Sequence, residues 1–329
     1  AITGAATFIT AQAAQDIILD QNNAFTTTVT MKAGTGGSLA FNDITFKDSD
    51  GVRLHSSAAS NGDLFIDAGT NLAVGGDLSI TATTGNITQG SELAVTNTST
   101  FTTSASGGTI TLNDADNTFT GAVALNTNGS SSNATVKNKI ALLLAASSVG
   151  GALSATATTG NITQNGALTI TGTSTLVTSA DHGTIDLKVN SIVNAFTGKL
   201  LITTNDDGSG TQGAVEIDGG TTNLIVGLST IDGDLVLLSG GTITDDGIAT
   251  VRGTLTATTD AGGSAITLNQ LVVTGALTLD PDGTGAVTIV NAAGLNLAAS
   301  TMGGTFSGTA TTGNITQTGA LDIEGATTL

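Results

Sequence analysis

Hydrophobic and polar residues alternate along many short stretches of this chain. The segments Leu78–Ala82, Leu168–Ile170 and Val287–Ile289 place aliphatic or alanine side chains two residues apart, with Ser or Thr between them. A period of two indicates strands that have one buried face and one exposed face. Gly, Asn and Asp separate these segments and favour turns. Because no segment shows a sustained helical period, the pattern predicts an all-β protein.

The chain also repeats itself over long distances. The peptide TATTGNITQ occurs at residues 81–89, 156–164 and 309–317, and a degenerate copy, GGTITDDG, starts at Gly240. Their equivalent glycines are Gly85, Gly160, Gly241 and Gly313, which recur at an interval of roughly 75 residues. Internal repeats of short strands are typical of solenoids, in which each coil stacks on the next. We therefore predict a parallel β-solenoid built from about four degenerate long repeats of this length.

We place the long repeats at about residues 4–96, 97–171, 172–252 and 253–324, within a single continuous solenoid over residues 1–329. The first repeat is longer than the others, and we expect an insertion around Asp43 to Asn61. Each long repeat should hold three or four coils, about 4.8 Å apart. Equivalent residues such as Asn86, Asn161 and Asn314 are then expected at equivalent corners. An array of small β-sandwiches is the alternative, but sandwiches usually have larger aromatic cores.

Composition limits the partners of such a protein. The chain has 329 residues, a net charge of −18 and only eight Lys and Arg, so it lacks the basic surface that nucleic acids or anionic membranes require. It has no cysteine, which excludes a disulfide framework. No apolar run is as long as a membrane-spanning helix requires. We expect neither nucleic-acid binding nor membrane insertion.

Further motifs follow each copy of the repeated peptide. Gly-Thr-Ile-x-Leu occurs at 108–112 and 183–187, and Asn-x-Phe-Thr-Gly at 117–121 and 194–198, with an earlier copy at 22–26. We expect Phe25, Phe119 and Phe196 to be core residues at a corner. Together with GNITQNGALTI (160–170), these motifs resemble the repeats of large bacterial exoproteins, the filamentous-haemagglutinin-like adhesins exported by two-partner secretion. The resemblance implies a right-handed parallel β-helix outside the cell, acting in attachment or matrix building without catalytic residues.

Enzymes also occur among parallel β-helices, so acid pairs are candidate catalytic groups. Pairs occur at Asp114/Asp116, Asp206/Asp207 and Asp245/Asp246, each in turn-like sequence. The chain has no Trp or Tyr to stack on a sugar, and Arg53 with His55 is an isolated basic pair. We expect no catalysis. A carbohydrate-binding or carbohydrate-active β-helix, with Asp245 and Asp246 as its acids, is the alternative.

Calcium binding is a second function that acidic residues at turns suggest. Ca²⁺ takes six to eight oxygen ligands from carboxylates and carbonyls. Asp48-Ser-Asp50-Gly and Asp280-Pro-Asp282-Gly have the local chemistry, although neither completes an EF-hand loop. Asp48, Asp50, Asp280 and Asp282 are the candidate calcium ligands, and ordinary solvated turns are the interpretation that the sequence favours.

The sequence therefore favours an extracellular structural or adhesive element at a bacterial cell surface. No amphipathic capping helix is evident at either end, and residues 2–8 match residues 323–329 in phase. Solenoid ends normally require caps. We expect either a section of a larger exoprotein or a subunit that associates end to end into a fibre. Surface glycans or matrix are the expected external partners.

Overall fold

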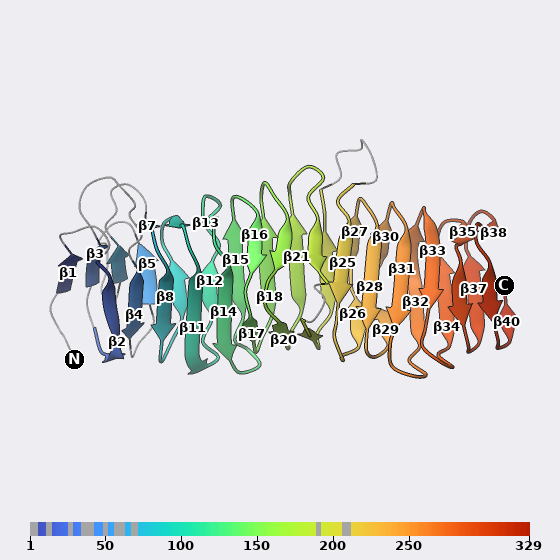
Figure 1. The fold of residues 1–329 in the computed structure, drawn as a ribbon, viewed down its shortest axis with the longest axis horizontal. Coiled ribbons are helices and arrows are strands. Elements are labelled where there is room, and N and C mark those ends of the chain that lie inside the picture. Colours follow the sequence, from blue (N-terminus) through green and yellow to red (C-terminus); the bar gives the residue numbers. More distant parts are fainter. Residues whose placement is uncertain are drawn as a thin grey trace. The chain divides into compact units, whose positions relative to one another are not determined.

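The computed structural model describes residues 6–10, 15–25, 29–33, 43–48, 52–55, 63–66, 72–188, 192–205 and 212–329. This described part is made of strands and turns and contains no helix (Figure 1). It forms an all-β parallel β-solenoid of about 12 turns, which confirms the predicted fold class. The chain divides into two compact parts, Ala1–Thr158 and Thr159–Leu329. The prediction of one continuous solenoid stays a prediction.

The first part has two main parallel sheets and one small sheet. Sheet 1a contains β1 (Ala6–Thr10), β3 (Val29–Ala33), β5 (Val52–His55), β6 (Asp63–Ile66), β9 (Ile87–Gln89), β12 (Ile110–Leu112), β15 (Ala134–Asn138) and β18 (Leu153–Ala157). Sheet 1b contains β2 (Ile17–Asn23), β4 (Ile44–Asp48), β8 (Leu78–Ala82), β11 (Ser99–Ser106), β14 (Val123–Asn128), β16 (Leu142–Leu144) and β17 (Ser147–Val149). The small sheet contains β7 (Leu72–Val74), β10 (Leu93–Val95) and β13 (Thr118–Phe119).

The second part has the same organisation. Sheet 2a contains β21 (Ser174–Thr178), β24 (Leu200–Thr203), β26 (Leu224–Val226), β27 (Ser229–Ile231), β29 (Ile243–Asp245), β30 (Ala249–Val251), β32 (Ile266–Val273), β34 (Val287–Asn291), β37 (Phe306–Ala310) and β40 (Thr327–Thr328). Sheet 2b contains β19 (Ile162–Gln164), β20 (Leu168–Ile170), β22 (Ile185–Leu187), β23 (Ala195–Phe196), β25 (Val215–Asp218), β28 (Leu235–Ser239), β31 (Leu255–Thr259), β33 (Ala276–Asp280), β35 (Leu295–Leu297) and β38 (Ile315–Gln317). The pair β36 (Ser300–Met302) and β39 (Leu321–Ile323) forms a small sheet.

Successive coils stack in register. In sheet 2b, Val215 pairs with Leu235, Leu235 with Leu255, and Leu255 with Leu277, so one coil takes about 20 residues here. Backbone hydrogen bonds pass from each coil to the next; for example, the N–H of Val215 donates to the carbonyl of Asp234 at 2.8 Å. The inward side chains form a thin aliphatic core. Among them are Val215, Leu235, Leu255 and Leu277, each at most 1 % exposed.

The two sides of a coil are built differently. One side is usually a strand of about five residues, such as β28, and the other is usually two short strands with a kink between them, such as β29 and β30. From β28 to the start of β37 the chain makes seven such half-coils: β28, β29 with β30, β31, β32, β33, β34, and β35 with β36. From β8 to the start of β18 the first part also makes seven. A long repeat therefore spans three and a half coils.

This half-integral repeat corrects in part the prediction that equivalent residues occupy equivalent corners: it holds for copies two repeats apart, such as Asn161 and Asn314, and fails for consecutive copies. Strands β19, β29 and β38 carry the same repeated peptide, yet β19 and β38 lie in sheet 2b and β29 lies in sheet 2a. In the first part, β8 lies in sheet 1b while its equivalent β18 lies in sheet 1a. Both sheets bury small aliphatic residues in the same alternation, so the sequence pattern does not distinguish them.

Some paired residues of the described strands are separated by unusually long intervals. Ile44 pairs with Leu78, and the long interval between these two residues contains most of the predicted insertion. Ile185 pairs with Val215, and this longer coil accounts for the wider spacing between Gly160 and Gly241. The described residues include no helix long and apolar enough to cross a membrane.

Candidate functional site

A buried glutamine–asparagine pair joins neighbouring coils in the second part. Asn194 Oδ1 accepts hydrogen bonds from Gln164 Nε2 (3.0 Å) and from the N–H of Leu168 (2.9 Å). Asn194 Nδ2 donates to Gln164 Oε1 (3.1 Å) and to the carbonyls of Leu187 (3.1 Å) and Asp218 (3.0 Å). We call this pair the amide clasp. It satisfies backbone groups at a corner where the strand ladder is interrupted.

The first part contains a second amide clasp. Gln89 Nε2 donates to Asn117 Oδ1, which also accepts the N–H of Leu93 at 2.8 Å. Asn117 Nδ2 donates to Gln89 Oε1 and to the carbonyl of Lys137, both at 3.1 Å. Each clasp joins the last residue of TATTGNITQ to the first residue of Asn-x-Phe-Thr-Gly. Sequence analysis found both motifs but did not pair them; their similar separations, 28 and 30 residues, were the available signal.

A second buried asparagine, which we call the corner cap, satisfies the backbone at the aromatic position. Asn138 Oδ1 accepts the N–H of Phe119 (2.9 Å), and its Nδ2 donates to the carbonyl of Phe119 (3.0 Å). Asn291 makes the same two bonds to Val273, at 2.8 and 2.9 Å. In the intervening repeat, the hydroxyl of Thr222 fills this role against Phe196. The amide and the hydroxyl suit this position because both donate and accept.

Asp48, a predicted calcium ligand, is the corner cap of an earlier coil. Its Oδ1 accepts the N–H of Phe25 at 3.1 Å, and the residue is 3 % exposed. The carboxylate therefore faces the inside of the wall. It occupies the position in its coil that Asn138 occupies in a later coil. Asp50, its predicted partner, is outside the described residues.

Asp280 and Asp282, the other predicted calcium ligands, line an open pocket of about 520 Å³ with Asp260 and Glu324. Thr259, Thr284 and Thr301 complete its polar wall. The pocket arises because acids from successive turns stack along the solenoid, which a linear search for Asp-x-Asp-Gly does not reveal. Among the residues that the structure describes, no three acidic or histidine side chains converge to hold a metal ion.

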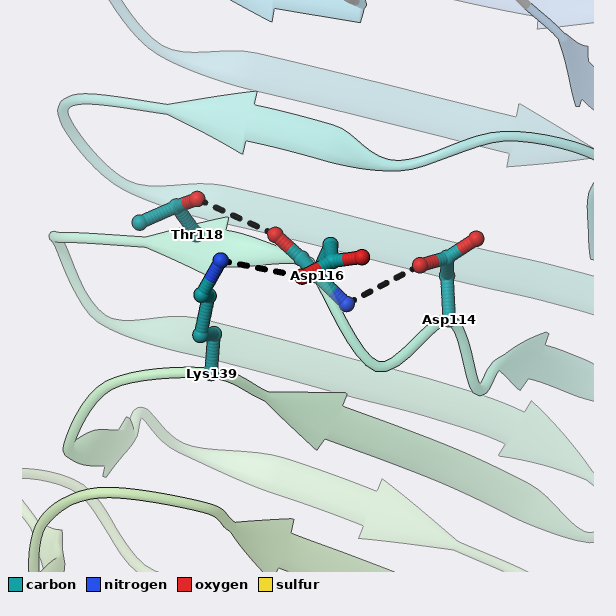
Figure 2. Close-up of polar contacts among 4 residues, drawn as sticks. All are labelled: Asp114, Asp116, Thr118 and Lys139. Atoms are coloured by element: carbon teal, nitrogen blue, oxygen red, sulfur yellow. Dashed lines mark hydrogen bonds and ion pairs between the residues drawn. The ribbon is translucent and has the colours of Figure 1, made fainter.

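The acid pair Asp114 and Asp116 forms part of a turn (Figure 2). Asp114 Oδ1 accepts the N–H of Asp116 at 2.9 Å, and Thr118 Oγ1 donates to the carbonyl of Asp116 at 3.2 Å. Lys139, from the next coil, donates to Asp116 Oδ1 at 2.9 Å. This hydrogen bond, with the charge of Asp116, raises the pKa of Lys139 above its ordinary value. These contacts join turns of neighbouring coils.

At Asp245 and Asp246 the sequence departs from the repeat, because the residues of the amide clasp are replaced. Asp245 replaces the glutamine of the amide clasp, and Leu271 replaces the asparagine. Asp245 Oδ2 accepts the N–H of Gln270 at 2.7 Å, and Asp246 Oδ2 pairs with Lys199 Nζ at 2.8 Å. Each carboxylate thus has one bonded oxygen, within the wall for Asp245 and on its surface for Asp246, while Asp245 Oδ1 is buried without a hydrogen-bond partner.

Phe25, Phe119 and Phe196 are 3 %, 1 % and 1 % exposed, which confirms that they are core residues. Arg53 and His55 belong to strand β5, whose side chains are outside the described part. Asp206 and Asp207 are also outside the described residues.

Comparison with known proteins gives one family. A model of repeats of unknown function (DUF5649) matches residues 1–32, 59–126, 131–203, 212–280 and 284–329. No curated protein matches the chain. No solved structure matches it either.

Proposed function

We propose, since the chain belongs to the DUF5649 family of repeats, that it is a structural repeat element of an extracellular protein, with adhesion at a bacterial surface as its role. The repeated β-solenoid is compatible with a structural repeat protein. The resemblance of its motifs to filamentous-haemagglutinin-like exoproteins supports the extracellular and adhesive part of the proposal.

The amide clasp is the observation that carries the structural role. Two repeats carry the same polar pair, Gln89 with Asn117 and Gln164 with Asn194, and both pairs bond one coil to the next. Residues that recur for a catalytic or ligand-binding purpose would instead be expected at an exposed cleft. The repeat thus encodes the wall itself.

The outer face of sheet 2a supports contact with glycans or matrix. Five successive coils place a hydroxyl group at the same outward position. These residues are Thr244, Thr267, Thr288, Ser307 and Thr328. A hydroxyl group both donates and accepts hydrogen bonds, as do those of a saccharide.

Stacking of a further coil on the last one is part of the proposal. A coil from a longer chain, or from a second copy joined end to end, would pair with the strand edge of a terminal coil.

Electron microscopy of the purified chain tests the structural role. Monodisperse rods support a section of a larger protein, and fibres support end-to-end association. Compact globular particles would contradict both versions. The location is tested separately, by protease treatment of intact cells that produce the full protein. Loss of the repeat region from intact cells supports surface exposure, whereas protection until lysis contradicts it.

Calcium binding is a second candidate, favoured by the pocket at Asp280 and Asp282. Carboxylates from three turns line this pocket beside threonine hydroxyls, which is the oxygen chemistry that Ca²⁺ prefers. No three of the described carboxylates converge as the structure stands, so binding would require them to draw together around the ion. The carbohydrate-active alternative has less support, because Asp245 and Asp246 have other partners. If cleavage of an acidic polysaccharide were found, replacing both aspartates with Asn without loss of cleavage would remove them as its site.

A further inference from the structure

The single proline of the chain lies at a turn in the wall of the open pocket described above. Pro281 directly follows Asp280, the last residue of β33, in the turn that leads to β34 (Figure 1). Asp280 is exposed, whereas the ring of Pro281 is buried. The peptide bond between these two residues therefore lies at the boundary between the wall and the solvent.

An aspartyl–prolyl bond differs chemically from other peptide bonds. The proline nitrogen carries two alkyl groups besides the carbonyl carbon, so the bond is a tertiary amide, and this nitrogen takes up a proton more readily than an ordinary peptide nitrogen. Proline has no N–H, so no donated hydrogen bond holds the nitrogen in the ladder. The aspartate side chain can close a five-membered ring onto its own carbonyl carbon. One dipeptide thus contains both a nucleophile and a good leaving group.

The turn holds the proline in place but leaves the aspartate carboxylate unrestrained. A methyl group added at Gly285 would lie 2.9 Å from Pro281 Cβ, so the ring packs against the far end of its own turn. The N–H of Asp282 donates to Thr259 Oγ1 at 3.1 Å, which joins the turn to the preceding coil. Within the described part, the carboxylate of Asp280 accepts no hydrogen bond. It is therefore free to turn onto its own carbonyl carbon.

Acids from successive coils surround the same pocket. Asp260 comes from the coil before, Asp282 from the same turn, and Glu324 from the coil after, and no lysine or arginine lines the pocket. At the turn of Figure 2, by contrast, Lys139 pairs with Asp116. In the pH range where carboxylic acids titrate, one carboxylate can be ionised while a neighbour carries a proton. The pocket thus provides both forms beside one bond.

We propose that this chain cleaves itself at the bond between Asp280 and Pro281 in mildly acidic conditions, with the neighbouring acids of the pocket as proton donors. A carboxylate oxygen of Asp280 bonds to the carbonyl carbon of the same residue, and the bond from that carbon to the proline nitrogen breaks. The nitrogen leaves with the electron pair of that bond and takes a proton from Asp260, Asp282 or Glu324, so it becomes a secondary amine. A water molecule from the open pocket then opens the cyclic anhydride, and Asp280 ends with two carboxyl groups.

The products should remain together in the folded protein. Cleavage divides the chain into residues 1–280 and 281–329. The two pieces stay paired on both sides of the coil, because Leu277 pairs with Leu297 in sheet 2b and Ile266 pairs with Val287 in sheet 2a. The cut therefore removes covalent continuity along the solenoid while its coils stay stacked.

Mass spectrometry under denaturing conditions tests the proposal. The full chain is incubated at the lowest pH at which circular dichroism still shows the native spectrum. We expect one piece that ends at Asp280 and one that begins at Pro281, with no change in native size. The bonds after Asp260 and Asp282 lack a proline and should stay intact. The folded chain should be cut at least about tenfold faster than a synthetic peptide of residues 276–286 at the same pH. A chain that stays whole, or is cut no faster than the peptide, overturns the proposal.

Variants separate the bond from its surroundings. Pro281→Ala should abolish the cut, because the leaving nitrogen is then that of an ordinary amide. Asp260→Asn/Glu324→Gln leaves the bond and the peptide sequence around it unchanged but should slow the cut at least about tenfold. The control Asp114→Asn/Asp116→Asn removes two acids from another turn and should be cut at the wild-type rate. Equal rates in wild type and Asp260→Asn/Glu324→Gln, or a cut at the same place in Pro281→Ala, would contradict the assigned roles.

Discussion

Replacing Asn194 with Leu removes an amide clasp while keeping the branched shape and the number of heavy atoms in the side chain. The side chain of Asn194 is fully buried and bonds to the N–H of Leu168, to the carbonyls of Leu187 and Asp218, and to both amide atoms of Gln164. Leucine satisfies none of these groups, so they would be left without partners inside the wall.

The cost follows from the number of orphaned groups. One buried polar group without a partner costs about 1–3 kcal/mol. Several backbone groups and the Gln164 amide lose partners together, and relaxation recovers part of the loss, so we expect a destabilisation of about 3–6 kcal/mol. The exposed neighbour Asn165 provides the control, since Asn165→Ala should change stability by no more than about 0.5 kcal/mol.

Urea denaturation followed by circular dichroism measures the effect, and hydrogen exchange at the N–H of Leu168 localises it. Solenoids can unfold in sections, so the midpoint of the transition that involves the second part is the relevant quantity. The double variant Asn194→Leu/Gln164→Leu should cost less than the sum of the two single variants, because both partners are then apolar. If Asn194→Leu matches Asn165→Ala, the clasp does not hold the coils together.

Three further predictions concern the cap, an ion pair and the pocket. Asn138→Asp should destabilise by about 1–3 kcal/mol in urea, because it loses the donor to Phe119, whereas Asp48→Asn should be neutral or stabilising; the opposite order would contradict the corner-cap assignment. The pKa of Lys139 is raised in the folded chain, so the ion pair with Asp116 gives a small stabilisation at low and neutral pH that is lost as the pH rises through that pKa. Any difference in stability between wild type and Lys139→Met should therefore disappear in strong alkali. A difference that persists there refutes the charge interaction. Ca²⁺ should raise the melting temperature of wild type more than that of Asp282→Asn/Glu324→Gln, and equal shifts would remove the pocket as a calcium site.

The fold class could be predicted because its main signals are local. Alternation with a period of two, glycine and asparagine at turns, and the return of TATTGNITQ each indicate stacked strands, and the structure confirms them. The half-integral repeat could not be predicted. Whether Ile243 lies in sheet 2a or 2b depends on the number of half-coils before it, and both sheets bury isoleucine in the same way.

The polar sites were predicted less well, for a related reason. The clasp joins residues far apart in the sequence, and only the coil length brings Gln164 beside Asn194. Asp48 has the local sequence of a calcium loop but lies at a corner-cap position, a role defined by its contact with Phe25 in the preceding coil. Glu324 reaches the pocket of Asp282 from a later coil, so no short motif includes both.

The central claim is that a long repeat advances three and a half coils, so that each copy of the motif faces the opposite side. Spin labels on cysteines at Thr163, Thr244 and Thr316, examined in pairs by double electron–electron resonance, test it directly. Labels at 163 and 316 should lie on one sheet, seven coils or about 34 Å apart. Labels at 163 and 244 should be about 17 Å apart along the axis. Because they lie on opposite sheets, they should also be separated across the axis by the sheet-to-sheet distance of about 10 Å plus the length of both labels. A 163–244 distance no longer than the axial separation would place both labels on one face and contradict the half-coil repeat.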